Sequence, residues 1–296
     1  MQQSQNRRDA IKSLLVGTAA IGSSTMLTSF TGEATETVAT HTFKGNINHS
    51  VCAWCYNSLS LDELCLAVKK IGFSAIDLVG PKGWPVLKKH GVVSSMCNGA
   101  ELNLEDGFAE KNFHEKLVKN YQDMIPLVAK AGYTNLICFS GSRRGMDDET
   151  GLKNAAEGLK KIVGLAEKHG VILQMELLNS KIDHKDYMCD LSSWGIELCK
   201  RVGSQNFKLL YDIYHMQIDE GDVIRTIQNN HQYFGHYHTA GVPGRHEIDE
   251  QQELYYPAIM KAIVATGFKG HVAQEFIPAK TDKIASLKEA VLLCDV

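Results

Sequence analysis

Four strand-like segments of the sequence each carry, near the carboxyl end, a side chain that could bind a metal ion. These side chains are Glu176, Asp212, His238 and Glu275. The segments around them are strongly apolar, and a buried carboxylate without a partner is costly. Three carboxylates and one imidazole would leave two positions on a six-coordinate ion for substrate or water. This mainly oxygen ligand set suits Mn²⁺ or Mg²⁺, with Co²⁺ tolerated and Zn²⁺ less favoured.

A divalent ion at this point would polarise a carbonyl and an adjacent hydroxyl of a bound substrate. Taken singly, each residue also has an ordinary structural interpretation. A glutamate at a strand end can be a solvated or salt-bridged rim residue, Asp212 could cap a turn, and His238 could be a hydrogen-bonded core histidine. Their occurrence on four consecutive strands favours the metal site. His236 is expected to point to the opposite face from His238 and is left out of the site.

The elements that must position these side chains alternate between strand and helix from residue 43 onward. The predicted strands are 45–54, 75–79, 92–97, 135–139, 171–177, 207–212, 233–239 and 271–276. The predicted helices are 61–71, 84–90, 108–131, 151–169, 191–202, 222–230, 253–266 and 281–293. Eight strand-then-helix units in about 250 residues predict an α/β protein with a single (β/α)8 TIM barrel, in which the carboxyl ends of the strands face the active site.

Local signals support these boundaries. Ser60 and Glu63 have the spacing of a helix capping box, and a glycine follows most of the predicted helices. A doubly wound open sheet is the alternative architecture. That fold would need a glycine-rich phosphate-binding turn after the first strand, and residues 54–57, Trp-Cys-Tyr-Asn, are not one.

Composition narrows the choice of partners. The chain has 296 residues, of which 44% are hydrophobic, and a formal net charge of −3. This charge gives no basic field for nucleic acid and no reason to expect a membrane surface as partner. The expected partner is a small-molecule substrate, and a homo-oligomer is left open.

Residues 1–40 are predicted to be a targeting segment, which leaves residues 41–296 as the catalytic domain. Arg7 and Arg8 are followed by Lys12 and by a weakly apolar run over residues 13–30. This pattern resembles a twin-arginine export signal and predicts a periplasmic protein. A disordered basic terminus is the alternative. If the signal interpretation holds, replacing both arginines should retain the protein in the cytoplasm.

Eight cysteines in an exported protein raise the question of disulfides. Cys65, Cys138 and Cys199 fall within apolar helix or strand patterns, where cysteine behaves as a small hydrophobic residue. Cys52 and Cys55 have the spacing of a redox motif, but they are expected to end a strand and not to open a helix. We therefore predict no disulfide framework.

The segments 175–179 (Met-Glu-Leu-Leu-Asn), 212–215 (Asp-Ile-Tyr-His), 235–238 (Gly-His-Tyr-His) and 274–276 (Gln-Glu-Phe) together resemble the xylose isomerase-like sugar isomerase and epimerase superfamily. Residues 242–247, Val-Pro-Gly-Arg-His-Glu, with 253–256, Glu-Leu-Tyr-Tyr, are most similar to its hydroxypyruvate isomerase branch. The resemblance covers roughly residues 45–290.

The resemblance implies a role for each site residue. The divalent metal would be held by Glu176, Asp212, His238 and Glu275. Glu176 and Glu275 would also act as the acid/base pair, and His215 and Arg245 would hold substrate oxygens. Such enzymes remove a proton next to a carbonyl, form an enediolate and return the proton elsewhere. Arg245 offers a fork for the carboxylate of a short 2-keto acid, although it could also be a surface residue, and His215 could instead orient a metal ligand.

Two departures from the family leave the substrate open. Ile182 stands where the family's epimerases commonly carry a further glutamate, and residues 180–189 differ from those of hydroxypyruvate isomerases. The main hypothesis is an isomerase or epimerase of small hydroxy-keto acids or sugars. The alternatives are a dehydratase of keto-polyols, an exported sugar-binding protein without activity and an endonuclease of abasic DNA. The endonuclease would need more histidines and a basic face.

Overall fold

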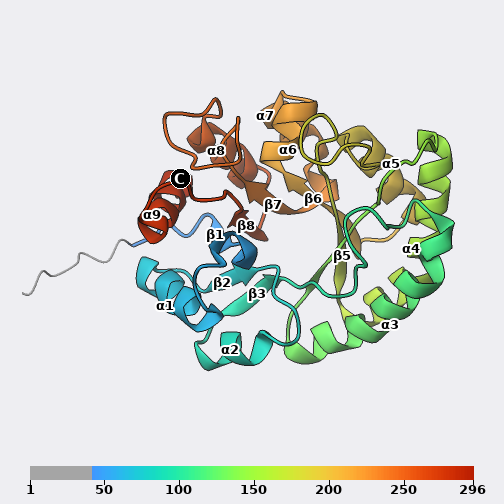
Figure 1. Cartoon of the computed structure of the whole chain (residues 1–296), viewed down its shortest axis with the longest axis horizontal. Coiled ribbons are helices and arrows are strands. Elements are labelled where there is room, and N and C mark those ends of the chain that lie inside the picture. Colours follow the sequence, from blue (N-terminus) through green and yellow to red (C-terminus); the bar gives the residue numbers. More distant parts are fainter. Residues whose placement is uncertain (1–41) are drawn as a thin grey trace, which may run out of the picture. The chain divides into compact units, whose positions relative to one another are not determined.

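Eight parallel strands form the inner ring of the computed structural model, which describes residues 42–296 (Figure 1). The strands are β1 (Asn48–Val51), β2 (Ala75–Asp77), β3 (Val93–Met96), β4 (Asn135–Cys138), β5 (Ile172–Glu176), β6 (Phe207–Asp212), β7 (Phe234–Thr239) and β8 (His271–Gln274). Six of them form one sheet in the order β1-β8-β7-β6-β5-β4, and β2 pairs with β3. Isolated parallel bridges, Cys52 to Asp77 and Cys97 to Leu136, connect the two sheets on both sides. The predicted TIM barrel is confirmed.

The helices lie outside this ring (Figure 1). They are α1 (Leu61–Ile71), α2 (Trp84–Lys89), α3 (His114–Ala131), α4 (Asp148–His169), α5 (Ser192–Val202), α6 (Ile213–Asp219), α7 (Val223–Asn230), α8 (Tyr256–Ala265) and α9 (Lys283–Cys294). Three short 3-10 turns accompany them: η1 (Ala53–Tyr56), η2 (Lys111–Phe113) and η3 (His231–Tyr233). This arrangement buries the apolar helix faces against the strands, which is the layer order of a TIM barrel.

Several helix boundaries follow from the local signals in the sequence. Ser60 and Glu63 form the predicted capping box at the start of α1. Gly170 ends α4 in the left-handed region, at φ 66°, where a residue with a side chain would be strained. The chain then turns directly into β5, which carries Glu176.

Four elements differ from the sequence-based expectation. The predicted helix 108–131 begins only at His114, after the short turn η2. The first strand ends at Val51, and the segment with Cys52 and Cys55 then forms the turn η1. The predicted helix 253–266 begins only at Tyr256, since residues 248–255 form a loop. Helix α6 was not predicted. It begins directly after β6 because the Asp212 side chain accepts a hydrogen bond from the backbone N–H of His215, at 3.2 Å.

The described residues contain eight buried cysteines, all of them free, in agreement with the predicted absence of disulfides. Within residues 42–296, the helices are too short or too polar to cross a bilayer. The predicted export signal lies outside the described residues and stays a prediction.

Candidate active site

The four side chains that the sequence singles out come together at the carboxyl ends of neighbouring strands. Glu176 ends β5, Asp212 ends β6, His238 lies near the end of β7, and Glu275 directly follows β8. One ligand atom from each lies within 4.8 Å of the others, and all four residues are buried. His238 Nδ1 is 2.9 Å from Glu275 Oε2, 3.1 Å from Glu176 Oε1 and 4.0 Å from Asp212 Oδ2. The carboxylates thus surround one edge of a single imidazole.

Burial and the charges of their neighbours shift the pKa values of these carboxylates in different directions. Burial, together with the charge of Glu275, raises the pKa of Glu176 and that of Asp212. Burial also acts to raise the pKa of Glu275, but His238 and Arg245 outweigh it and hold this pKa well below its usual range. Three carboxylates so close together repel one another when they are ionised, and a divalent ion between them would remove this repulsion.

The donor set fits a divalent ion. Glu176 Oε1 is buried and makes no hydrogen bond within the described part of the chain, although it lies close to His238. A buried polar atom without a hydrogen-bond partner is uncommon and calls for an unseen ligand or ion. Three carboxylates and one imidazole favour Mn²⁺, Mg²⁺ or Co²⁺ over Zn²⁺, which more often binds sulfur and nitrogen.

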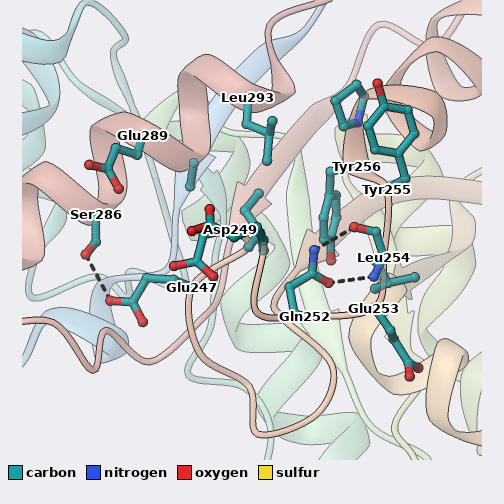
Figure 2. Close-up of a pocket in the computed structure, with 14 residues that line it drawn as sticks. Glu247, Asp249, Gln252, Glu253, Leu254, Tyr255, Tyr256, Ser286, Glu289 and Leu293 are labelled. Carbon is teal, nitrogen blue, oxygen red and sulfur yellow. Dashed lines mark hydrogen bonds between the residues drawn. The ribbon is translucent and has the colours of Figure 1, made fainter. Parts of the chain in front are cut away.

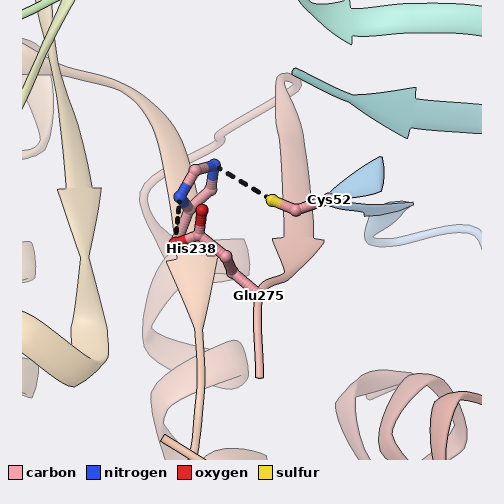
Figure 3. Close-up of side chains that lie close together, drawn as sticks. All are labelled: Cys52, His238 and Glu275. Atoms are coloured by element: carbon pink, nitrogen blue, oxygen red, sulfur yellow. Dashed lines mark hydrogen bonds and ion pairs between the residues drawn. The ribbon is translucent and has the colours of Figure 1, made fainter. Parts of the chain in front are cut away.

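The imidazole of His238 presents its two nitrogens to different surroundings (Figure 3). Nδ1 faces the carboxylates, whereas Nε2 lies 2.8 Å from Asp77 Oδ2 and 3.7 Å from the sulfur of Cys52. Nδ1 is therefore the nitrogen that could bind the ion. Asp77, at the end of β2, holds the opposite edge of the ring.

Arg245 lies beside the carboxylates and not at the surface, with 14% of its side chain exposed. Its Nη2 donates to Glu275 Oε2 at 2.7 Å and is 3.9 Å from Asp212 Oδ2. The guanidinium lies 5.2 Å from the ring of Trp54 and 5.5 Å from that of Tyr214. Trp54 Nε1 in turn donates to Glu275 Oε1 at 2.9 Å. The Nε of Arg245 is buried and has no hydrogen-bond partner among the described residues.

His215, the second predicted substrate-binding residue, is fully buried next to Asp212, and its Nε2 is 3.6 Å from Asp212 Oδ2. Asn179 fixes its tautomer. The Oδ1 of Asn179 accepts from two backbone N–H groups, and its Nδ2 therefore faces His215 Nδ1, at 2.6 Å. Burial and the charge of Arg245 lower the pKa of His215 well below its usual value. With Nδ1 accepting from Asn179, the neutral form of His215 carries its proton on Nε2, which is buried and has no hydrogen-bond partner among the described residues.

Comparison with known proteins places this site in a family. Residues 66–291, more than half of the chain, match the family described as "Xylose isomerase-like TIM barrel". The chain belongs to this family. The xylose isomerase-like barrel is also what the motifs around Glu176, Asp212, His238 and Glu275 indicate.

Among the relatives of this xylose isomerase-like barrel is a 2-oxo-tetronate isomerase of Cupriavidus necator, 35% identical over 122 residues. That match covers 41% of this chain and 46% of the relative, so it spans less than half of either protein. A Drosophila melanogaster protein named "Putative hydroxypyruvate isomerase" is 26% identical over 249 residues, covering 81% of this chain and 93% of the relative.

One similar solved structure is described as an AP endonuclease, family 2, from Brucella melitensis. It has a TM-score of 0.73 and 23% sequence identity, and it covers 81% of this chain and 97% of that one. At this identity the likeness shows a shared fold.

Sequence reasoning misplaced His236 in this xylose isomerase-like barrel. Side chains two residues apart in a strand lie on the same face, so His236 and His238 both point into the barrel. The structure places His236 Nε2 3.1 Å from Asp77 Oδ2, the oxygen that also contacts His238. The expectation that His236 faces away was wrong. The alternation rule itself could have corrected it.

Sequence reasoning also missed Asp77, Trp54 and Asn179. Asp77 ends a short strand, and the candidate metal ligands also lie at or near strand ends, so this position was the available signal. Trp54 belongs to a 3-10 turn that had been assigned to a strand, and its partner Glu275 lies 221 residues further along the chain. No local pattern indicates that pairing.

A separate cavity of about 560 Å³ lies between the loop that precedes α8 and helix α9 (Figure 2). Glu247, at its wall, accepts a hydrogen bond from Ser286, and Gln252 holds the backbone of Leu254. The lining residues include none of the four carboxylate and imidazole groups, nor Arg245 or His215. This cavity is therefore distinct from the candidate active site.

Proposed function

We propose that this protein is a metal-assisted isomerase or epimerase that acts on a small hydroxy-keto acid or sugar through an enediolate. The observation that carries the proposal is the placement of two carboxylates, Glu176 and Glu275, on the same buried cation site. Relatives named as isomerases and an epimerase support this reaction class. A divalent ion held by these residues would polarise the carbonyl and stabilise the oxygens of the enediolate.

The two carboxylates are unequal in their surroundings, which suits two different tasks. Glu275 accepts hydrogen bonds from Trp54 and Arg245, and its Oε2 lies 2.9 Å from His238 Nδ1. Glu176 has a buried oxygen that makes no hydrogen bond among the described residues. In the proposed reaction, one carboxylate removes the proton from carbon and the other returns it at the neighbouring carbon or on the opposite face.

Two further residues would orient the substrate. His215 offers its Nε2 proton to a substrate oxygen, because Asn179 occupies the other ring nitrogen. Arg245 has a free Nε beside the site and can bind a carboxylate. Ile182 is 66% exposed and cannot supply the hydroxyl contact of a glutamate at that position. These features favour a short substrate with a carboxylate next to its carbonyl over a long neutral sugar.

The test is solvent deuterium exchange into three- to six-carbon hydroxy-ketones and hydroxy-keto acids, in the presence of Mn²⁺. We expect the protein to introduce deuterium at the carbon next to the carbonyl. Glu176→Gln and Glu275→Gln, each with its metal content verified, should lose exchange by roughly 10²–10⁴-fold, the usual contribution of a general acid or base. Glu149→Gln is the control, because Glu149 is exposed and pairs with Arg201 far from the site.

Exchange that persists at the wild-type rate in either site variant would contradict the assignment of two bases. New ultraviolet absorbance during turnover would show a conjugated carbonyl and hence a dehydratase. Binding of substrate without any exchange would show a binding protein. Each of these outcomes overturns the isomerase proposal in a different way.

A further inference from the structure

Asp77 lies directly behind the candidate metal site, across the barrel from the strands that carry the ligands. It ends β2 and is completely buried. Its Oδ2 lies 2.8 Å from His238 Nε2 and 3.1 Å from His236 Nε2. The two imidazole rings are 5.3 Å apart and nearly perpendicular. One carboxylate oxygen thus contacts two histidines of the same strand.

The other oxygen of Asp77 is also fixed. Ser95, on β3, donates its hydroxyl to Asp77 Oδ1. Ser95 in turn lies 2.5 Å from the hydroxyl of Ser50 on β1. The carboxylate therefore accepts on Oδ1 from β3 and on Oδ2 from the two histidines of β7, and it has little freedom to rotate. Such a rigid acceptor determines the orientation of whatever donates to it.

The contact decides which nitrogen of His238 is available to an ion. Asp77 can only accept, so Nε2 must carry the proton, and a neutral ring then has its lone pair on Nδ1. Nδ1 is the nitrogen that faces Glu176 and Glu275. A half-turn of the ring about its Cβ–Cγ bond would replace Nδ1 by a carbon and break the hydrogen bond to Asp77.

We propose that Asp77 is a positioning residue of the metal site, which fixes the tautomer and the ring orientation of His238 so that Nδ1 binds the ion. His236 is the second donor to the same oxygen, and Ser95 is the donor to the other. This proposal rests on the proposed metal site but not on the substrate. Carboxylates that orient a metal-binding histidine in this way typically contribute 10–100-fold to metal affinity.

A different interpretation of the same residues is a second metal site made of Asp77, His236 and His238, which together could hold an ion. In that case the imidazole of His238 would bridge two ions. The geometry fits the positioning role, because Asp77 Oδ2 lies at hydrogen-bond distance from the Nε2 atoms of both histidines. Metal stoichiometry distinguishes the two interpretations.

The experiment measures Mn²⁺ binding to the full chain and to Asp77→Asn, by equilibrium dialysis with metal analysis. Asparagine presents one acceptor oxygen and no charge, whereas Asp77 accepts on both oxygens from Ser95, His236, His238 and the more distant thiol of Cys52. We expect one ion per wild-type chain and a dissociation constant that rises about 10–100-fold in the variant. Asp62→Asn is the matched control, since Asp62 also contacts a histidine at 2.8 Å, His90, far from the ligands.

A purely structural role for Asp77 would lower the melting temperature without moving the metal affinity or the spectrum of bound Co²⁺. We expect the visible bands of the Co²⁺-loaded protein to shift in Asp77→Asn and to stay unchanged in Asp62→Asn. If Asp77→Asn does not fold, the wild-type protein with ¹⁵N-labelled histidine and bound Mg²⁺ provides the test. His238 should then show a protonated Nε2 and an unprotonated Nδ1.

Three results would overturn the proposal. The first is a folded Asp77→Asn variant with wild-type affinity and spectrum. The second is two ions per wild-type chain, one of them lost in Asp77→Asn. The third is a proton on Nδ1 of His238 in the Mg²⁺-loaded protein. A wild-type chain that binds no divalent ion would instead refute the proposed metal-assisted function, and the role of Asp77 with it.

Discussion

The two halves of the barrel contribute to the site in different ways. Strands β5 to β8 supply the four residues whose polar atoms face one another, Glu176, Asp212, His238 and Glu275. The segments from β1 to β3 supply Trp54, Asp77 and Ser95. Trp54 donates to Glu275 and Asp77 contacts His238, whereas Ser95 donates to Asp77. We call these two sets the ligand half and the supporting half. The candidate ligands lie in one half, and several of the groups that orient them come from the other.

This difference shows why the ring must close before the site exists. Asp77 and His238 are 161 residues apart in the sequence, and Trp54 and Glu275 are 221 apart. Strand β1 pairs with β8, and Cys52, which follows β1, bridges to Asp77 at the end of β2. The pairing of the first and last strands therefore brings the supporting half close to the ligand half.

Substitutions in the ligand half should have the largest effects on metal binding, and Asp212→Asn tests this expectation. The amide keeps the oxygen that caps α6 but loses the ligand charge. At a Mn²⁺ concentration of 100 times the dissociation constant, the wild-type protein should gain about 2.7 kcal/mol of unfolding free energy, and the variant should gain little of it. Without metal, the variant should be as stable as wild type or more so, because a buried carboxylate facing Glu275 has been removed.

Denaturant unfolding with Mn²⁺ and with EDTA measures both quantities for Asp212→Asn. A full metal-dependent gain in stability in this variant would show that Asp212 is not a ligand.

Trp54→Phe tests the direct contact of the supporting half with the ligand half. Phenylalanine keeps an aromatic face for Arg245 but loses the N–H that donates to Glu275 at 2.9 Å. A hydrogen bond to a charged group is worth about 1.5–3 kcal/mol, and the lower value applies here because Trp54 is partly exposed. We expect kcat to fall about tenfold with metal affinity little changed, as measured by steady-state kinetics.

Trp84→Phe is the control for Trp54→Phe. Trp84 donates its N–H to the carbonyl of Val79, at 2.8 Å, away from the site. The control should cost some stability and leave kcat unchanged. Equal kcat values in the two variants would show that the hydrogen bond from Trp54 to Glu275 does not contribute to catalysis.

Ser95→Ala should have the smallest effect, because Ser95 acts through Asp77. Loss of one neutral hydrogen bond costs about 0.5–1.5 kcal/mol of stability, and only part of this free energy should appear as weaker metal binding. We expect the Mn²⁺ dissociation constant to rise roughly two- to fivefold. Ser94→Ala is the control, since Ser94 is also buried on β3 but donates to the carbonyl of Met96. Both variants should lose similar stability, and only Ser95→Ala should weaken metal binding.

The sequence by itself determined the architecture and the ligand half. Apolar strands, amphipathic helices and the glycines that end them are local patterns, so they predict eight strand-then-helix units without any knowledge of distant contacts. A buried acid or histidine near a strand end is also a local feature. Glu176, Asp212, His238 and Glu275 could therefore be proposed as one group before their distances were known.

Only the tertiary structure decided the supporting half and the details of the substrate-binding residues. The role of Asp77 depends on a histidine 161 residues away, and the free nitrogen of His215 depends on how Asn179 is held. Arg245 could be placed at the surface or in the site until its contact with Glu275 was seen. A sequence pattern indicates which side chains within one segment are buried, but it does not indicate which distant residues they contact. The direction of a hydrogen bond between two segments is fixed only when the barrel closes and brings them together.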